Sequence, residues 1–375
     1  MKYFLIFISV SRFLKASSLD CILVSQRGTS SVGRASACQA EGRRFETGVP
    51  HHFHNIILFL LLFFIVSCGG GGSSDSSLEN SSSSNPTVTS ISENCEITTW
   101  NNKLQRCDLM HEGLERYYFI YVPNNLNNEK SIPLLFALHG YGSTARNHFS
   151  YTNYIPIADQ NNLIVVYPQG APMSTTLTSS SSHWNVGGWT VGSNVKDVEF
   201  IDALLDLINN KINFDQTRIY SSGMSNGGFM SYHLACNLSS RIAAIASVTG
   251  SMTPQTYTNC NPTHATPILQ IHGLLDTVVP YNGLSYMESI PKIMKYWSEY
   301  SSCNSEPDET ITENITEGYV INIQEYKNCL NDVNVKLFIH SSMGHTWPRF
   351  SNYGISASTE VWNFVSQYNL YGKIN

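Results

Sequence analysis

Short apolar runs of four to six residues alternate with longer stretches of helical periodicity from residue 132 to the end of the chain. Fully buried strands of a parallel sheet are apolar on both faces, and each parallel pair needs a crossover connection. The 198–212 stretch supplies one such crossover, because its apolar residues recur at helical spacing. The alternation predicts an α/β fold, a mostly parallel central sheet with helices on both faces. The expected strands are 134–138, 163–167, 218–221, 243–248, 268–271 and 335–339.

Two stretches before this series alternate apolar and polar residues instead. Residues 95–100 and 116–122 have the period of two that is typical of half-buried strands, so we predict an antiparallel pair at the edge of the sheet. Residues 359–368 are expected to close the chain as a helix. We therefore assign 94–375 to one domain.

The run 218–221 leads into the sequence GMSNGG at 223–228, and 229–234 then continue as a helix. A serine held between a strand and a helix lies on a sharp turn, and flanking glycines let the two backbones pack closely. The N-terminal end of the following helix adds a positive dipole beside Ser225. In this context the G-x-S-x-G motif predicts that Ser225 is a catalytic nucleophile.

A serine nucleophile needs a base, and the base needs a carboxylate that fixes its tautomer. When the serine lies on a strand-to-helix turn, the acid and then the histidine follow it along the chain. Asp276 comes just after the expected strand 268–271, and His345 comes just after 335–339. We predict that both lie beside Ser225 and complete a catalytic triad.

Other residues compete for the two supporting roles. Asp276 could only cap the helix that follows it, which would leave Asp308 or Asp332, both in polar loops or beside a cysteine, as the acid. His272 and His340 are alternative bases. We expect both histidines to be structural, because His340 ends a strand and His272 precedes a glycine.

The sequence His139-Gly140-Tyr141-Gly142 follows the first expected strand. A loop in this position supplies one donor to the oxyanion that forms during attack, and the residue after the nucleophile supplies the other. We predict the backbone N–H groups of Tyr141 and Asn226 as these donors, with His139 bracing the loop. Five further histidines of this domain, at positions 111, 148, 183, 233 and 264, have no metal-ligand spacing, so we expect no metal.

A serine-rich stretch at 173–194 follows the second expected strand and carries Trp184 and Trp189. Its position puts it over the edge of the sheet where the nucleophile is expected. We predict that Trp184, Trp189 and Trp347 line a substrate pocket, where aromatic rings suit a planar acid or a sugar. The alternative is that Trp184 and Trp189 pin a long loop to the core.

Six segments occur in a fixed order between residues 132 and 348: LLFALHGYG, LIVVYPQG, DVEFIDALLDLI, GMSNGGFMSYHLAC, IHGLLDTVVPYNG and GHTWP. Together they resemble the polyhydroxybutyrate depolymerase and feruloyl esterase group of α/β hydrolases. The resemblance implies the α/β-hydrolase fold and a carboxylic ester hydrolase without cofactor, with Ser225, Asp276 and His345 as its triad. Arg349 stands where this group usually has glycine after the Trp-Pro pair, which leaves the substrate preference open.

Six cysteines follow Cys68, an even number that is typical of disulfides in exported proteins. Proximity in sequence favours three pairs, although other pairings and buried free thiols remain alternatives. The resemblance also implies the second and third pairs. The favoured pairs are Cys95–Cys107, Cys236–Cys260 and Cys303–Cys329.

Residues 56–66 form an unbroken apolar run, IILFLLLFFIV. A bilayer span needs about 20 apolar residues, so this run fits the apolar region of a signal peptide instead. It ends at Cys68 in a sequence that resembles the lipobox of bacterial lipoproteins, although a signal peptide with a chance cysteine is the alternative. We expect a signal region at 1–67, of which 1–55 could be a mis-called start, and a lipid-anchored Gly/Ser-rich tether at 68–93.

The charge balance of 22 Lys+Arg against 28 Asp+Glu, with no basic stripe after Arg44, argues against a nucleic-acid partner. The expected partners are an ester substrate and a membrane, through the lipid. The predicted function is an exported serine carboxylesterase, acting through an acyl-enzyme on feruloyl or acetyl polysaccharide fragments or on hydroxyalkanoate esters. The alternatives are a serine peptidase and a catalytically silent surface lipoprotein that binds glycans.

Overall fold

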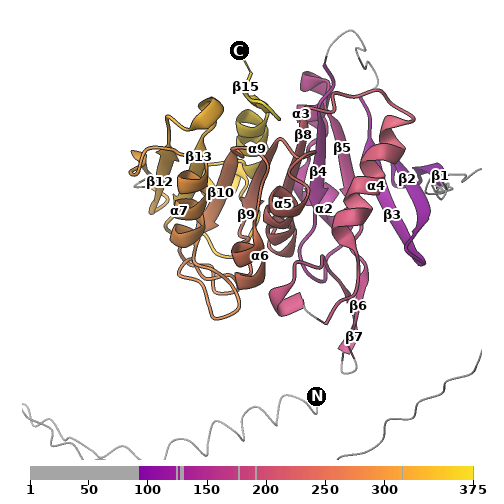
Figure 1. Ribbon diagram of the computed structural model, residues 1–375, viewed down its shortest axis with the longest axis horizontal. Coiled ribbons are helices and arrows are strands. Elements are labelled where there is room, and N and C mark those ends of the chain that lie inside the picture. The colour runs from indigo at the N-terminus through magenta and orange to yellow at the C-terminus, as the bar shows by residue number, and fades with distance from the viewer. Residues whose placement is uncertain are drawn as a thin grey trace, which may run out of the picture. The chain divides into compact units, whose positions relative to one another are not determined.

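The structure is a computed structural model that describes residues 93–123, 126, 131–175, 178–190, 192–314 and 316–374. Its centre is an 11-stranded sheet, shown edge to edge in Figure 1. The strands are β1 (Glu93–Thr98), β2 (Asn101–His111), β3 (Leu114–Tyr121), β4 (Leu134–Leu138), β5 (Ile164–Pro168), β8 (Ile219–Met224), β9 (Ala244–Val248), β10 (Ile268–Gly273), β11 (Asp308–Asn314), β12 (Tyr319–Tyr326) and β13 (Val335–His340). Their order across the sheet is β1-β2-β3-β5-β4-β8-β9-β10-β13-β12-β11.

The middle of this sheet is parallel. Strands β5, β4, β8, β9, β10 and β13 pair in parallel with one another, in that order. Every residue of β4, β5, β9 and β10 is buried, which explains why these strands are predominantly apolar in the sequence. The predicted α/β fold with a parallel centre is confirmed.

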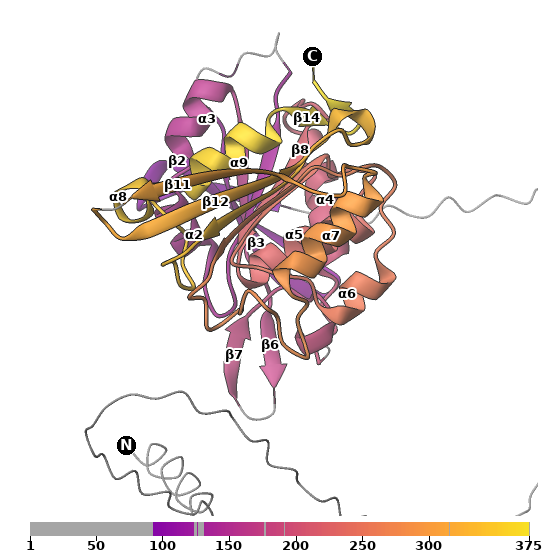
Figure 2. The same cartoon turned by 90° about the vertical axis from the view of Figure 1, so that its left-hand side faces the viewer.

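Helices cover both faces of the sheet, as Figure 2 shows in a view along it. Each face buries its own cluster of apolar side chains against these helices. One face carries α2 (Ala145–Thr152), α3 (Ile155–Asn161) and α9 (Ala357–Val365). The other carries α4 (Asp197–Asn209), α5 (Asn226–Asn237), the short α6 (Pro254–Asn259) and α7 (Ile290–Tyr300). The chain ends in α8 (Phe350–Tyr353), then α9, then a small pair, β14 (Tyr368–Asn369) and β15 (Gly372–Lys373).

Both edges of the sheet differ from the prediction. Strand β1 pairs with β2, and β2 pairs with β3, so the predicted direct pairing of 95–100 with 116–122 is wrong. At the other edge, Asp308 begins β11 instead of lying in a loop, and β11 and β12 continue the sheet antiparallel to β13. Strands β2 and β11 are hard to recognise because polar residues dominate them, and β11 has no buried residue.

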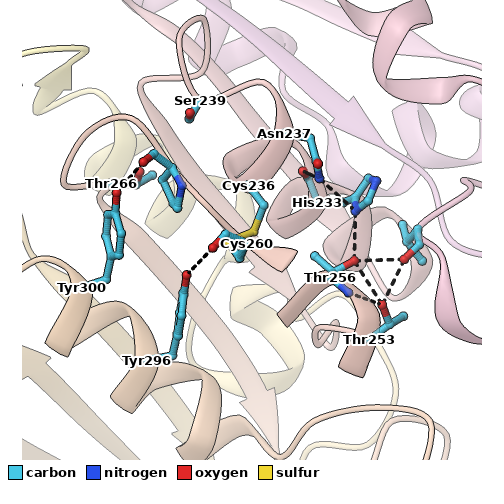
Figure 3. Close-up of a disulfide and its surroundings, with 12 residues drawn as sticks. His233, Cys236, Asn237, Ser239, Thr253, Thr256, Cys260, Thr266, Tyr296 and Tyr300 are labelled. Carbon is cyan, nitrogen blue, oxygen red and sulfur yellow. Dashed lines mark hydrogen bonds between the residues drawn. A yellow bond between two sulfur atoms is a disulfide. The ribbon is translucent and has the colours of Figure 1, made fainter. Parts of the chain in front are cut away.

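Three disulfides confirm the predicted pairing of the six cysteines. Cys95–Cys107 joins two residues that face each other in the β1–β2 register. Figure 3 shows Cys236–Cys260, which joins the last turn of α5 to the residue that ends α6. Cys303–Cys329 joins the segment after α7 to the segment before β13. A crosslink over loops of this size contributes roughly 3 kcal/mol in the chain-entropy model.

The predicted signal region, Cys68 and nearly all of the 68–93 tether lie outside the described residues. Among the described helices, none has the length and apolarity needed to cross a membrane.

Candidate active site

Ser225 occupies the turn between β8 and α5 with φ 53° and ψ −121°. A positive φ is strained for a residue with a side chain, and such strain persists only where the surroundings impose it. A Cβ on Gly223 would lie 2.3 Å from the backbone of Gly227, and one on Gly227 would lie 2.1 Å from the carbonyl oxygen of Leu138. The backbone N–H of Ser225 donates to the carbonyl oxygen of Val248 at 2.9 Å. The glycines therefore permit the close packing that holds the serine on this turn.

His345 and Asp276 meet at the carboxyl ends of β13 and β10. Nδ1 of His345 lies 2.8 Å from Oδ2 of Asp276, whose side chain is fully shielded from solvent. The other carboxylate oxygen accepts hydrogen bonds from the N–H groups of Val278 and Val279. Burial raises the pKa of Asp276, but the hydrogen bonds from His345 and Val279 outweigh it and bring the pKa below its ordinary value. An ionised Asp276 holds the proton of His345 on Nδ1, which leaves Nε2 able to accept a proton.

The competing acids and bases take other roles. His272 is fully buried and its Nε2 lies 2.8 Å from the carbonyl oxygen of Val279; burial lowers its pKa to about 4. His340 bonds a backbone carbonyl oxygen in α8. Asp308 lies at the far edge of the sheet, and Asp332 ends a 3₁₀ turn, η2 (Leu330–Asp332). Within the described ranges, no group of three or more His, Cys, Asp or Glu side chains is arranged to hold a metal.

The loop after β4 passes directly beside the nucleophile, because a Cβ on Gly140 would lie 3.4 Å from Cβ of Ser225. Nδ1 of the buried His139 lies 2.8 Å from the carbonyl oxygen of Gly140, while Nε2 accepts from the N–H of Gly170 at 2.9 Å. A carbonyl oxygen only accepts, so His139 carries its proton on Nδ1. Burial lowers the pKa of His139 to about 4, which keeps the ring neutral. The ring therefore fixes the peptide whose N–H belongs to Tyr141.

Trp184 and Trp347 are largely inside the protein. Trp184 is fully buried; its Nε1 donates to the carbonyl oxygen of His139 and its backbone N–H donates to Oδ1 of Asn226. The prediction that Trp184 lines a substrate pocket is therefore wrong, since it pins its loop to the core against the loop after β4. Trp347 is 6% exposed and donates from Nε1 to Ser358 in α9, so it offers little surface to a substrate.

Trp189 differs from these two, because it is only partly buried and contacts Tyr141 in the loop after β4. It lies in a 3₁₀ turn, η1 (Gly188–Thr190). Its ring centroid is 5.8 Å from that of Tyr141 and 5.9 Å from that of Phe229, both in edge-on geometry. Tyr141 is 43% exposed. The two rings form an aromatic wall next to the turn that carries Ser225; we call Tyr141 and Trp189 the aromatic wall.

Sequence reasoning missed the supports of this region. A hairpin of β6 (Pro172–Thr175) and β7 (Thr178–Ser182) extends away from the sheet (Figure 1), and the carbonyl oxygen of Ser182 accepts from the N–H of Gly142. Gln169 accepts from the N–H of Ala145 at the start of α2, and its Nε2 lies 3.1 Å from Nε2 of His139. Gln169 could have been found from its position directly after a buried strand, because the loops that form such sites begin there.

Residues 125–304 match the protein family described as Phospholipase/Carboxylesterase, a stretch that includes Ser225 and Asp276 and ends before His345. The bifunctional acetylxylan esterase/xylanase XynS20E of Neocallimastix patriciarum is 26% identical over 264 residues, which cover 70% of this chain and 35% of that protein. Feruloyl esterase B of Piromyces equi is 28% identical over 268 residues, which cover 68% of this chain and 46% of that protein. The probable feruloyl esterase C of Aspergillus clavatus is 30% identical over 171 residues, 45% of this chain and 57% of that protein.

The chain thus spans less than two thirds of the length of each of these relatives. The parallel sheet with helices on both faces and the strained serine turn give the chain an α/β-hydrolase fold, and its sequence is similar to feruloyl and acetylxylan esterases.

Proposed function

We propose that this protein is an exported serine carboxylesterase that hydrolyses feruloyl or acetyl esters on soluble fragments of plant-type polysaccharides. The observation that carries the proposal is the hydrogen bond between His345 and the buried Asp276, at the same edge of the sheet as the strained Ser225. The names of the relatives, which are feruloyl and acetylxylan esterases, support the substrate class. Three disulfides are typical of a protein that folds in an oxidising compartment, which supports export.

The proposed reaction has two steps that use the same residues. Oγ of Ser225 transfers its proton to Nε2 of His345 and attacks the ester carbonyl carbon. The N–H groups of Tyr141 and Asn226 bind the oxyanion, and the alcohol leaves with the proton from His345. Water, activated by His345, then attacks the acyl-enzyme and releases the carboxylic acid. Asp276 stabilises the imidazolium form of His345 in both steps.

The aromatic wall supports an acyl group with a ring. Offset or edge-on contact with an aromatic ring contributes about 0.5–1.5 kcal/mol beyond the buried area. Ferulate presents such a ring to Tyr141 and Trp189, whereas an acetyl group or a hydroxybutyrate unit does not. The aromatic wall therefore favours feruloyl esters over short hydroxyalkanoate oligomers, and the acetylxylan esterase among the relatives supports acetyl esters.

A comparison of methyl ferulate, acetylated xylo-oligomers and hydroxybutyrate trimers under identical conditions tests the proposal. We expect kcat/KM to be higher for methyl ferulate or the acetylated xylo-oligomers than for the trimers. Trp189→Ala should lower kcat/KM for methyl ferulate and leave p-nitrophenyl acetate nearly unchanged. A highest kcat/KM for the trimers, with no effect of Trp189→Ala on the aromatic ester, would remove the polysaccharide substrate from consideration.

A further inference from the structure

The ring of Trp189 is not held by a hydrogen bond of its own. Its Nε1 is buried and has no acceptor among the described residues. The ring is therefore held in place by the packing against Tyr141 and Phe229 and by the backbone of η1. Whatever supports that backbone determines where the aromatic wall stands.

The support is α6. The hydroxyl groups of Thr253 and Thr256 both donate to the carbonyl oxygen of Val186, each at 3.0 Å. The N–H of Gly188, the residue before Trp189, donates to Oε1 of Gln255 at 2.9 Å. The fit is close, because a Cβ on Gly188 would lie 2.6 Å from Cβ of Thr253. The turn that bears Trp189 rests on the first residues of this helix.

Helix α6 has only six residues, and a helix this short is not stable alone. Two contacts fasten it to α5, and Figure 3 shows them side by side. The Cys236–Cys260 disulfide joins its C-terminal end to α5, and Nδ1 of His233 lies 2.9 Å from Oγ1 of Thr256. Helix α5 begins immediately after Ser225. A continuous set of contacts therefore connects the nucleophile helix to the aromatic wall through the disulfide and α6.

We propose that the Cys236–Cys260 disulfide is a positioning element for the aromatic wall, and that it thereby sets the preference for aromatic over acetyl esters. The inference rests on the proposed function for its substrates. The disulfide does not touch the reacting atoms. It holds α6 against α5, α6 holds Val186 and Gly188, and these hold Trp189 opposite Tyr141.

The double variant Cys236→Ser/Cys260→Ser tests this in the full chain, with Cys303→Ser/Cys329→Ser as the matched control at a disulfide far along the sheet. The first variant should raise KM for methyl ferulate roughly two- to tenfold, the range that one aromatic contact is worth. Its kcat, and its kcat/KM for p-nitrophenyl acetate, should change less than about twofold by the same scale. The control variant should leave the ratio of kcat/KM for methyl ferulate to kcat/KM for p-nitrophenyl acetate unchanged. If this ratio of kcat/KM values is unchanged in Cys236→Ser/Cys260→Ser, or changes equally in both double variants, the proposal is overturned.

A second pair of variants keeps all three disulfides and covers the case in which the cysteine variant does not fold. Thr253→Val removes the hydroxyl that bonds Val186 at nearly constant volume, whereas Thr253→Ser retains it. Thr253→Val should raise KM for methyl ferulate in the same direction, and Thr253→Ser should restore it. Equal KM values for both variants would contradict the role of α6.

Amide hydrogen exchange separates failure of this inference from failure of the proposed function. Exchange at 186–190 should be faster in Cys236→Ser/Cys260→Ser than in the wild type, and unchanged in the control variant. If the wild type hydrolyses no aromatic ester but exchange accelerates as expected, the substrate assignment fails and the positioning role stands. If exchange at 186–190 does not change, the positioning role fails whatever the substrate is.

Discussion

Nη2 of Arg116 lies 2.8 Å from Oδ1 of Asp197, and the two side chains are 1% and 0% exposed. The pair joins β3 to the first turn of α4. The second carboxylate oxygen of Asp197 accepts from the N–H of Asn185, at the start of the turn that leads to Trp189. The guanidinium also lies over the ring of Phe200, 3.8 Å from its centroid. The buried carboxylate of Asp197 therefore links β3, α4 and the loop that leads to Trp189.

Asp197→Asn should be strongly destabilising, because it leaves the charge of Arg116 buried and uncompensated. Removing one partner of a buried ion pair typically costs about 3–5 kcal/mol. Urea unfolding followed by circular dichroism measures this. The exposed pair of Lys196 and Glu112 is the control, and Glu112→Gln should leave the unfolding midpoint unchanged. Equal midpoints for wild type and Asp197→Asn would show that the buried pair adds nothing.

The proposed triad of Ser225, Asp276 and His345 predicts two separate losses of activity. Ser225→Ala should remove nearly all ester hydrolysis, and a serine-reactive phosphonate should label Ser225 alone. Asp276→Asn should lower kcat by about 10³–10⁴-fold, since an amide favours the wrong tautomer of His345. Turnover of p-nitrophenyl acetate by the purified variants is the measurement. Substantial activity in Ser225→Ala would refute the assignment of the nucleophile.

Stability should fall as the pH is lowered from 7 to 5. Burial lowers the pKa of His139, His233 and His272 to about 4 in the folded protein, against an ordinary value of 6.5. Between these values the unfolded chain binds protons that the folded chain does not, so the stability present above pH 6.5 is progressively lost toward pH 4. The fully buried His139 alone accounts for about 2 kcal/mol at pH 5. Asp276, with a pKa below its ordinary value, contributes only at lower pH. A urea midpoint that is the same or higher at pH 5 would contradict this.

Cys68→Ser should move the protein from the membrane fraction to the soluble exported fraction, if Cys68 carries the lipid that the sequence predicts. Fractionation followed by immunoblotting measures the distribution. Cys38→Ser, at a cysteine within the predicted signal region, is the control and should leave the protein with the membranes. A Cys68→Ser protein that still sediments with membranes would rule out this anchor.

The buried centre of the sheet could be predicted because strands that are buried on both faces are rich in apolar residues. Strands β4, β5, β9 and β10 are apolar runs that end where loops begin, and each was recognised. Strands β2 and β11 were missed for the opposite reason, because polar residues dominate both. Their stability comes from hydrogen bonds to a neighbouring strand, which polar residues make as well as apolar ones do. Nothing in DETITEN, the sequence of β11, distinguishes an edge strand from a loop.

The positions of the proposed triad residues were easier to predict than the surface around them. Ser225, Asp276 and His345 each follow a strand, so the topology alone brings them to one edge. The burial of Trp184 depends instead on its hydrogen bonds with His139 and Asn226, which are far from it in the sequence. No local sequence pattern encodes these contacts. The same holds for the buried pair of Arg116 and Asp197, which lie 81 positions apart.

The Cys95–Cys107 crosslink has a mechanical consequence for a protein that is tethered through the chain before Glu93. A pull on such a tether reaches Cys95 two residues into β1, before most of the hydrogen bonds of that strand carry load. The covalent bridge passes the force to Cys107 in the middle of β2, which pairs with β3 along eight consecutive positions. The edge strand therefore cannot be peeled from the sheet one bond at a time. A force on such a tether would therefore load the β2–β3 pairing at Cys107.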